Sequence, residues 1–289
     1  MTYKRSRVVL LVAVGFLAGA AACRHDSSYA GQSADEWAML LRDGDSSQRM
    51  SAATAFLHEP PAERAHVFAV LRARLDRNAS IRAVVDSVVT HLPDGALKTI
   101  VDAIDDPDVA LRRGAARALG HYRNDDDDEI RALIQATRDP DDSVRTLALY
   151  SLGDRSAAAR AALSRIRELA TTPGPQRAAA LEVLPNVDTE SRSLMSIYLP
   201  AVTDTNAAVR AIGVQMLLAA GGGPQVIPLV ARALDDPDAH VRAVAARVLA
   251  AEAHHDSSAY SALVLRATSA DSVVRRLADS VKTVLGARP

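Results

Sequence analysis

The sequence predicts an all-α protein, a right-handed α-solenoid of about eight helical hairpins stacked in a row. The first observation is a periodic arginine, at intervals of 30 to 33 residues: Arg49, Arg82, Arg112, Arg145, Arg177, Arg210, Arg242 and Arg275. The second is an acidic column six positions before it, made of Asp43, Asp76, Asp106, Asp139, Asp204 and Asp236. A repeat of about 20 to 50 residues indicates stacked units, each of which needs its neighbours to bury its apolar face.

The first element along the chain is a predicted export signal, residues 1–22. Lys4, Arg5 and Arg7 precede a 15-residue apolar run, Val8 to Ala22, that ends in small residues. A basic start, an apolar run and a small-residue end are typical of a secretory signal. The run is shorter than the roughly 20 residues that a membrane-spanning helix needs.

The residues Ala20-Ala21-Ala22-Cys23 resemble the cleavage box of bacterial lipoproteins, with alanine in place of the more usual leucine. The resemblance implies that Cys23 is acylated, becomes the first mature residue and anchors the protein to a lipid bilayer. A soluble exported protein cut at an ordinary A-x-A site and an uncleaved anchor are the alternatives. Residues 23–32 then form a short polar tether. Arg24 follows the cysteine, which favours the outer membrane facing the periplasm if the organism is Gram-negative.

The repeat domain is predicted over residues 33–289, and each unit contains two helices. Amphipathic first helices are expected near residues 96–104, 130–137, 159–169, 194–202, 226–234 and 260–267. A second helix follows each acidic turn, because Asp or Asn, preferred N-cap residues, lie four positions before most of the arginines. Val144, Ala148 and Leu152 show the apolar stripe that follows, at i, i+4 and i+8. Each unit is therefore a helical hairpin of about 32 residues.

The periodic arginine lies in the first turn of its helix, where the helix dipole disfavours a cation. We expect carboxylates to compensate for this, because one guanidinium can bridge the acids of its own turn and of the adjacent unit. The arginine and aspartate columns would then form an ion-pair ladder along the stack. The alternative is a set of solvated surface arginines.

These units resemble HEAT repeats, most closely the short kind of the phycobilisome-lyase-like group. The likeness is carried by Asp105-Asp106-Pro107-Asp108 with Leu111-Arg112, by Asp139-Pro140-Asp141 with Val144-Arg145, and by Asp235-Asp236-Pro237-Asp238 with Val241-Arg242. The resemblance implies an α-solenoid, a scaffold that carries many unrelated functions.

Two units depart from the pattern. Thr171-Thr172-Pro173-Gly174-Pro175 replaces the acidic turn of the fifth unit, which predicts a local change in curvature. In the last unit, Asp279 and Lys282 occupy positions that are alanine or leucine in most of the others. Polar residues there are expected of a terminal unit that faces solvent.

The composition limits the possible partners. The net charge is −1, aromatic residues make up 3% of the chain, and acids interleave every basic segment. A nucleic-acid partner is therefore not expected, since it would require a basic patch and stacking platforms. We expect a protein partner instead.

His58, His91 and His121 each lie nine residues after their arginine and are the candidate metal ligands. Units one helix diameter apart hold such residues too far apart for three of them to share a metal, so contact with the helix C-terminal dipole is the simpler interpretation. No phosphate loop, nucleophile elbow or cysteine pair occurs in the sequence, and no cofactor or catalytic residue is predicted.

The sequence therefore favours a non-enzymatic, lipid-anchored scaffold or adaptor that binds another protein at the cell envelope. An accessory lyase-like or metal-binding enzyme built on the HEAT scaffold is the first alternative, and a purely structural envelope spacer is the second. An enzyme would need a deep pocket with convergent polar groups, whereas a scaffold needs only an open surface.

Overall fold

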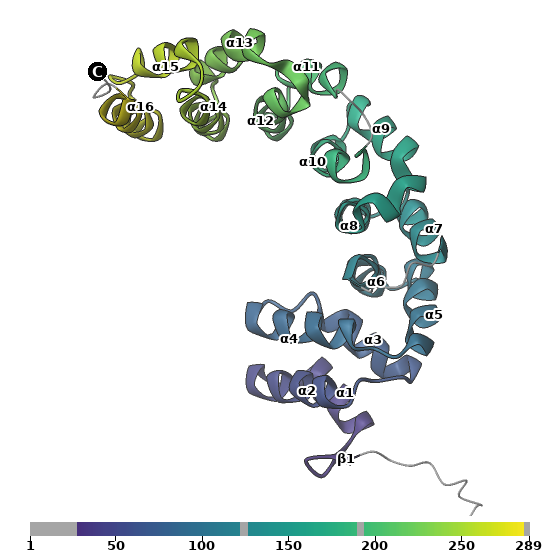
Figure 1. Cartoon of the computed structure of the whole chain (residues 1–289). Helices are drawn as coiled ribbons and strands as arrows, with labels where there is room; N and C mark the ends of the chain where they lie inside the picture. The colour runs from purple at the N-terminus through teal and green to yellow at the C-terminus, as the bar shows by residue number, and fades with distance from the viewer. Residues whose placement is uncertain (1–27, 122–126, 190–193, 286–289) are drawn as a thin grey trace, which may run out of the picture.

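The computed structural model describes residues 28–121, 127–189 and 194–285 (Figure 1). The predicted signal segment 1–22 and the predicted lipidation site Cys23 lie outside the described residues. Within the described residues no helix is long and apolar enough to cross a membrane.

The described chain is almost entirely helical, which confirms the all-α solenoid. The inner and outer helices alternate along the chain: α1 Ala34–Asp43, α2 Ser46–His58, α3 Arg64–Ala73, α4 Ala79–Thr90, α5 Asp94–Asp102, α6 Val109–His121, α7 Asp127–Ala136, α8 Asp142–Asp154, α9 Leu163–Thr171, α10 Arg177–Val187, α11 Met195–Ala201, α12 Ala207–Met216, α13 Ile227–Arg232, α14 Ala239–Glu252, α15 Ser257–Val264 and α16 Ser272–Leu285.

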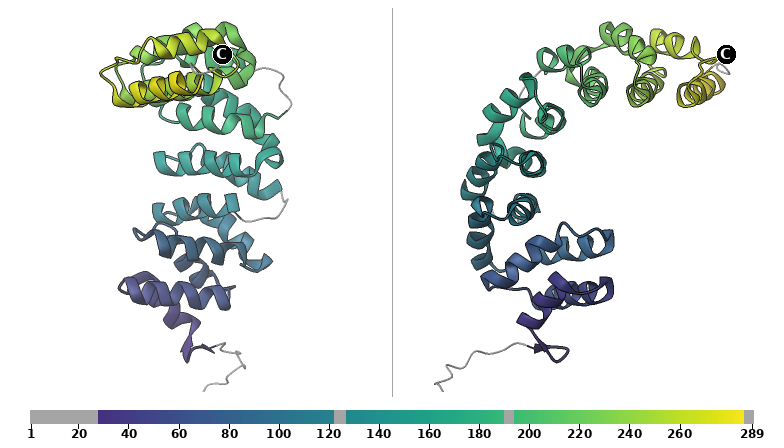
Figure 2. Two further views of the ribbon diagram at one scale, coloured as in Figure 1. Left: turned by 60° about the vertical axis from the view of Figure 1, so that its left-hand side comes forward. Right: turned by 180° about the vertical axis from the view of Figure 1, so that it is seen from behind.

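The helices pair into hairpins that stack as an open arch (Figure 1). The even-numbered helices line the inner side of the arch, and the odd-numbered helices form its outer side, as the views in Figure 2 also show. The first and last hairpins lie at opposite ends of the arch. Each hairpin therefore has only its neighbours for support, as expected of a solenoid.

Side-chain caps start the inner helices. Asp45 accepts from Ser47 and Gln48, Asn78 from Ser80, and Asp238 from His240 and Val241. These bonds satisfy backbone N–H groups that the first turn of a helix leaves unpaired, at about 1 kcal/mol each. The predicted acidic turns therefore do begin the second helix of their units.

The core is a continuous apolar layer between the inner and outer rows. The residue before each periodic arginine is buried in most units, for example Ile81, Leu111, Val144, Val241 and Val274, each at most 1% exposed. In the last unit, Asp279 and Lys282 are exposed.

A small β-hairpin precedes the first helix. Strand β1, Ser28–Tyr29, pairs antiparallel with β2, Gln32–Ser33, through a turn in which Ala30 and Gly31 have positive φ. The Trp37 indole donates to the Tyr29 carbonyl at 3.2 Å. The last residues of the predicted tether therefore pack against the first unit.

The stack changes direction at two places. In Figure 1 the inner row turns between α8 and α12, a stretch that includes the Pro173–Pro175 turn. The helix axes also rotate between α4, seen from the side, and α6, seen end-on. Here α6 packs closely on α3, because a Cβ on Gly114 would lie 2.2 Å from the Leu71 carbonyl oxygen. Sequence reasoning did not predict this second rotation.

Candidate functional site

The arginine and aspartate columns meet across the junctions between units. The arginine of one unit pairs with the column aspartate of the next: Arg49 with Asp76 at 2.7 Å, Arg112 with Asp139 at 2.8 Å, Arg210 with Asp236 at 2.8 Å, and Arg177 with Asp204. In the last of these junctions Arg242 pairs with the N-cap residue Asp271, at 2.8 Å, since serine occupies column position 269.

Each aspartate of the ladder serves two purposes. One oxygen of Asp139 accepts the backbone N–H of Asp141 at 2.8 Å and shapes its own turn, while the other accepts Nε of Arg112 at 2.8 Å. The arginine is also held from its own side, because its Nη1 donates to the Asp106 carbonyl at 2.9 Å. The hydrogen bond to Asp139 raises the pKa of Arg112.

Five predicted members, including Asp106, do not pair across a junction in the described residues. Arg82 donates to the backbone of its own turn, at 2.6 Å to the Asp76 carbonyl, and no ion pair joins it to Asp106. Arg145 pairs with Asp142 of its own helix, because the next unit has Thr171 in the column. Arg275 donates to the Ser269 carbonyl of its own turn, at 2.6 Å.

Asp43 lies before the first arginine and pairs with its neighbour Arg42 at 2.7 Å, on the surface. Within the described residues no arginine of another hairpin pairs with it, so it is outside the ladder. The ladder links neighbouring hairpins, and at one junction its pair Arg177 and Asp204 also borders a hollow of about 610 Å³ beside the Pro173–Pro175 turn.

A second charged cluster, which sequence reasoning missed, fills the junction where α6 rotates. Arg74 is fully buried and lies 3.0 Å from Asp86 on α4, which also pairs with Arg117 on α6 at 3.5 Å. Burial lowers the pKa of Arg74 to about 10. Nearby, Arg72 pairs with Asp108 at 2.8 Å. This junction thus uses outer-helix arginines where the Arg82 ladder contact is absent.

The three histidines of the proposed metal column have three different environments. His58 stacks on Tyr29 with 5.0 Å between ring centroids, His91 Nδ1 lies 2.7 Å from the Ser87 carbonyl, and His121 Nδ1 lies 3.2 Å from the Arg117 carbonyl. Among the described residues no three His, Cys, Asp or Glu side chains are grouped to hold a metal ion. The structure does not bring the three imidazoles together.

The inner surface of the arch is shared by several units. On each inner helix the residue five positions after the periodic arginine points about opposite to the buried stripe and so faces into the arch. We call this set the inner row: Thr54, Ser87, Arg117, Tyr150, Glu182, Gln215, Arg247 and Ser280. Its members from Tyr150 onward are exposed, and the Tyr150 hydroxyl donates to Glu182 at 3.0 Å.

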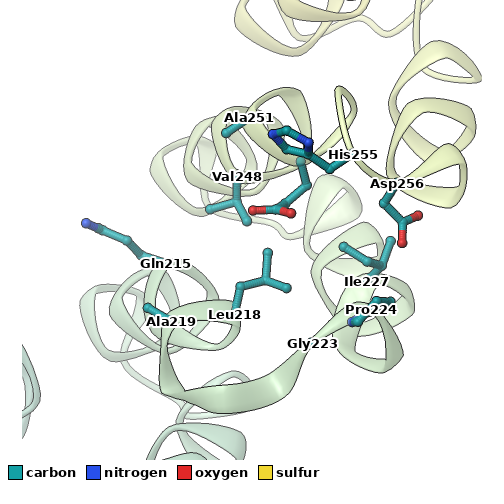
Figure 3. Close-up of a pocket in the computed structure, with 11 residues that line it drawn as sticks. Gln215, Leu218, Ala219, Gly223, Pro224, Ile227, Val248, Ala251, His255 and Asp256 are labelled. Carbon is teal, nitrogen blue, oxygen red and sulfur yellow. The ribbon is translucent and has the colours of Figure 1, made fainter.

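One hollow of about 540 Å³ lies beside the inner row between α12, α13 and α14 (Figure 3). Its walls are apolar: Leu218, Ala219, Pro224, Ile227, Val248 and Ala251. Gln215, Glu252, His255 and Asp256 supply its polar groups. We call it the α12–α14 hollow.

Glycines produce this hollow. Gly221 and Gly223 have φ of 93° and 55°, conformations that side-chain-bearing residues rarely adopt. They form a wide turn between α12 and α13. The signal in the sequence is the triplet Gly221-Gly222-Gly223, which sequence reasoning did not use.

The model of the family described as HEAT repeats matches residues 64–153, 97–185 and 196–281 of the chain. No curated protein matches the chain. The family match therefore rests on the repeat pattern and extends over most of the hairpins.

Two solved structures share the architecture. The E. coli protein YibA is 15% identical, with a TM-score of 0.53 over 86% of this chain and 92% of its own. A homology model of the full-length AP-3 complex is 12% identical, with a TM-score of 0.57 over 86% of this chain and 50% of its own. The complex of CpcE and CpcF of phycocyanin lyase from Nostoc sp. PCC7120 is 21% identical over 90% of this chain and 99% of its own, with a TM-score of only 0.40. At these identities the likeness concerns the fold alone.

Proposed function

Because the chain belongs to the HEAT-repeat family, we propose that it is a scaffold that binds another protein at the cell envelope, anchored by a lipid on Cys23. The observation that carries the proposal is the open inner surface of the arch, to which the units from Tyr150 onward contribute one exposed side chain each. A surface of this kind suits a partner that contacts several units at once.

The composition of the inner row supports a protein partner. Arg117, Glu182 and Arg247 alternate in charge, and Tyr150 and Gln215 supply further hydrogen-bonding groups. Tyr and Arg are enriched at protein interfaces, where an aromatic or guanidinium group provides both contact area and directed bonds. A uniformly basic surface, which a nucleic acid would require, is not what these residues form.

The proposed anchor rests on the N-terminal sequence that precedes the repeat domain. The basic start, the apolar run and Cys23 support export with lipidation, and Ser28 begins the first hairpin only a few residues later. The lipid would then hold the end of the arch formed by α1 and α2 at the membrane.

In-cell photocrosslinking tests the binding surface. A benzoylphenylalanine replaces Tyr150 or Gln215 on the inner row, and in matched controls it replaces the exposed outer-helix residues Leu199 or Leu265. We expect one adduct of constant mass from both inner positions, competed by excess unlabelled chain, and none from the outer positions. Equal adducts from both faces, or none from the inner row, would contradict the proposal.

The anchor has a separate test. Mass spectrometry of the mature N-terminus should show an acylated Cys23, and Cys23→Ala should release the chain from the membrane fraction. A membrane-bound Cys23→Ala chain, or an unmodified Cys23 at the mature N-terminus, would contradict the proposed lipid anchor. Neither result would bear on the proposed protein-binding surface.

A further inference from the structure

We propose that the α12–α14 hollow binds a lysine or arginine side chain of the protein partner. The inference rests on the proposed function and specifies the chemistry that the partner presents. The hollow lies beside the inner row, since Gln215 belongs to both, so a partner bound inside the arch can reach it (Figure 3).

The walls fit the aliphatic part of such a side chain. Leu218 approaches from the segment that follows α12, Val248 from α14 and Ile227 from α13 (Figure 3). Lysine and arginine bury their methylene stems along apolar surface and keep the charged head at a polar edge. The volume of about 540 Å³ leaves room for one such side chain and its backbone.

The hollow has two carboxylates, Glu252 and Asp256, and one imidazole, His255. No lysine or arginine is among its lining residues. Asp256 uses one oxygen to cap α15, accepting from Ser258 at 2.7 Å and Ala259 at 3.1 Å. Glu252 is half-buried, and within the described residues its carboxylate has neither an ion-pair partner nor a hydrogen-bond donor.

Glu252 therefore differs from the paired ladder aspartates. Asp139 and Asp236 each pair with an arginine, whereas no lysine or arginine lines the hollow that Glu252 faces. A carboxylate that is partly desolvated gains from a cation brought by a ligand. An uncharged apolar ligand would bury the walls but leave Glu252 without a partner.

Two short peptides test this on the purified full-length chain. The first is acetyl-Gly-Lys-Gly-amide, and the second replaces lysine with norleucine, which keeps the stem and lacks the ammonium. Methyl NMR follows Leu218, Ile227 and Val248. We expect saturable shifts of these methyl groups with the lysine peptide, and binding about fivefold weaker with the norleucine peptide, the size of a partly exposed ion pair.

Glu252→Gln keeps the shape and removes the charge, and should abolish the preference for lysine. Glu182→Gln is the matched control, because Glu182 lies on the inner row outside the hollow and should leave the preference unchanged. Equal binding of both peptides, a preference that survives Glu252→Gln, or no shift at these methyl groups would overturn the proposal.

The two proposals fail in distinguishable ways. If Tyr150 crosslinks a partner while the two peptides bind equally, the proposed scaffold function is supported and the proposed site for a lysine or arginine side chain is contradicted. If the lysine peptide binds through Glu252 while no position crosslinks a protein, the hollow binds cationic side chains but the scaffold lacks its partner.

Discussion

At the scale of single residues, the ladder aspartates explain why the acidic column recurs. Asp236 accepts the Asp238 backbone N–H at 2.9 Å with one oxygen and Arg210 Nε at 2.8 Å with the other. The hydrogen bond from Arg210 lowers the pKa of the Asp236 carboxyl below its usual range. Asparagine could shape the same turn but would give the guanidinium no charge partner, so the column needs a carboxylate.

The energy of a ladder contact can be measured at Arg112. Arg112→Met should lower the free energy of unfolding by about 2 kcal/mol, because it leaves the Asp139 carboxylate largely buried without its cation. That side chain is only 7% exposed. Arg82→Met is the control, since Arg82 contacts only its own turn, and it should cost less than about 1 kcal/mol. Urea denaturation provides both values, and equal losses would show that the cross-junction pair adds nothing.

The ladder and cap aspartates predict a loss of stability in acid. The Arg113 hydrogen bond lowers the pKa of Asp141 to about 2. The folded chain therefore binds fewer protons than the unfolded chain between that value and the ordinary one near 4. The stability from this group is present above about pH 4 and is lost as the pH falls toward 2.

Asp141→Asn isolates this contribution, because asparagine can still cap α8. The variant should be less stable than the parent at pH 7, and the difference should vanish near pH 2 in thermal melts. A difference that stays constant over this range would mean that the charge of Asp141 does not matter.

At this scale the sequence predicted part of what the structure shows. The arginine and aspartate columns were visible because they recur with the repeat. Arg74 and Asp86 were not, since their pairing depends on the rotation of α6 and occurs at one junction. Glu252 could not be singled out either, because nothing in its local sequence shows that it lacks a partner.

At the scale of elements, the junction between the second and third hairpins depends on Gly114. The equivalent position holds a larger side chain in every other unit: Ser51, Val84, Leu147, Ala179, Ile212, Val244 and Leu277. The missing side chain was therefore a signal in the sequence. Its absence lets the backbone of α6 approach α3 directly. The rotation of the stack at this junction follows from that approach.

Gly114→Ala should lower the free energy of unfolding by about 3 kcal/mol, because the new methyl group would overlap the Leu71 carbonyl. The better helix propensity of alanine, about 1 kcal/mol, offsets only part of this. Gly95→Ala in α5 is the matched control, since nothing lies within 4 Å of its added Cβ, and it should be neutral or slightly stabilising. Chemical denaturation of both variants checks the contrast, which a neutral Gly114→Ala would contradict.

At the scale of the whole molecule, the arch has two separated ends and stability is local. Leu263→Ala in α15 removes a fully buried side chain and should cost about 2 to 4 kcal/mol. Hydrogen exchange followed by mass spectrometry should show faster exchange in α15 and α16, with α1 to α4 unchanged. Faster exchange throughout the chain would indicate a single cooperative unit instead.

The fold class was predictable because periodicity, capping residues and apolar stripes all agree. For the course of the stack, the sequence predicts a change of curvature only where a turn sequence changes, at Pro173–Pro175, which lies within the stretch where the inner row turns (Figure 1). The rotation at α6 and the α12–α14 hollow depend on glycines. The effect of these glycines depends on the conformation they adopt and on which neighbouring backbone approaches them. A sequence shows such glycines but not what approaches them.

The two-sided aspartate also bears on how such a chain can lengthen. The hairpin formed by α11 and α12 has an arginine directed toward the following hairpin and a carboxylate that meets the preceding one, as in the contacts from Arg177 to Asp204 and from Arg210 to Asp236. A tandem duplication of one hairpin therefore copies both halves of the contact together, and the new copy fits either neighbour without further mutation. Duplication of such a hairpin therefore preserves the arginine–aspartate contact at both of its junctions.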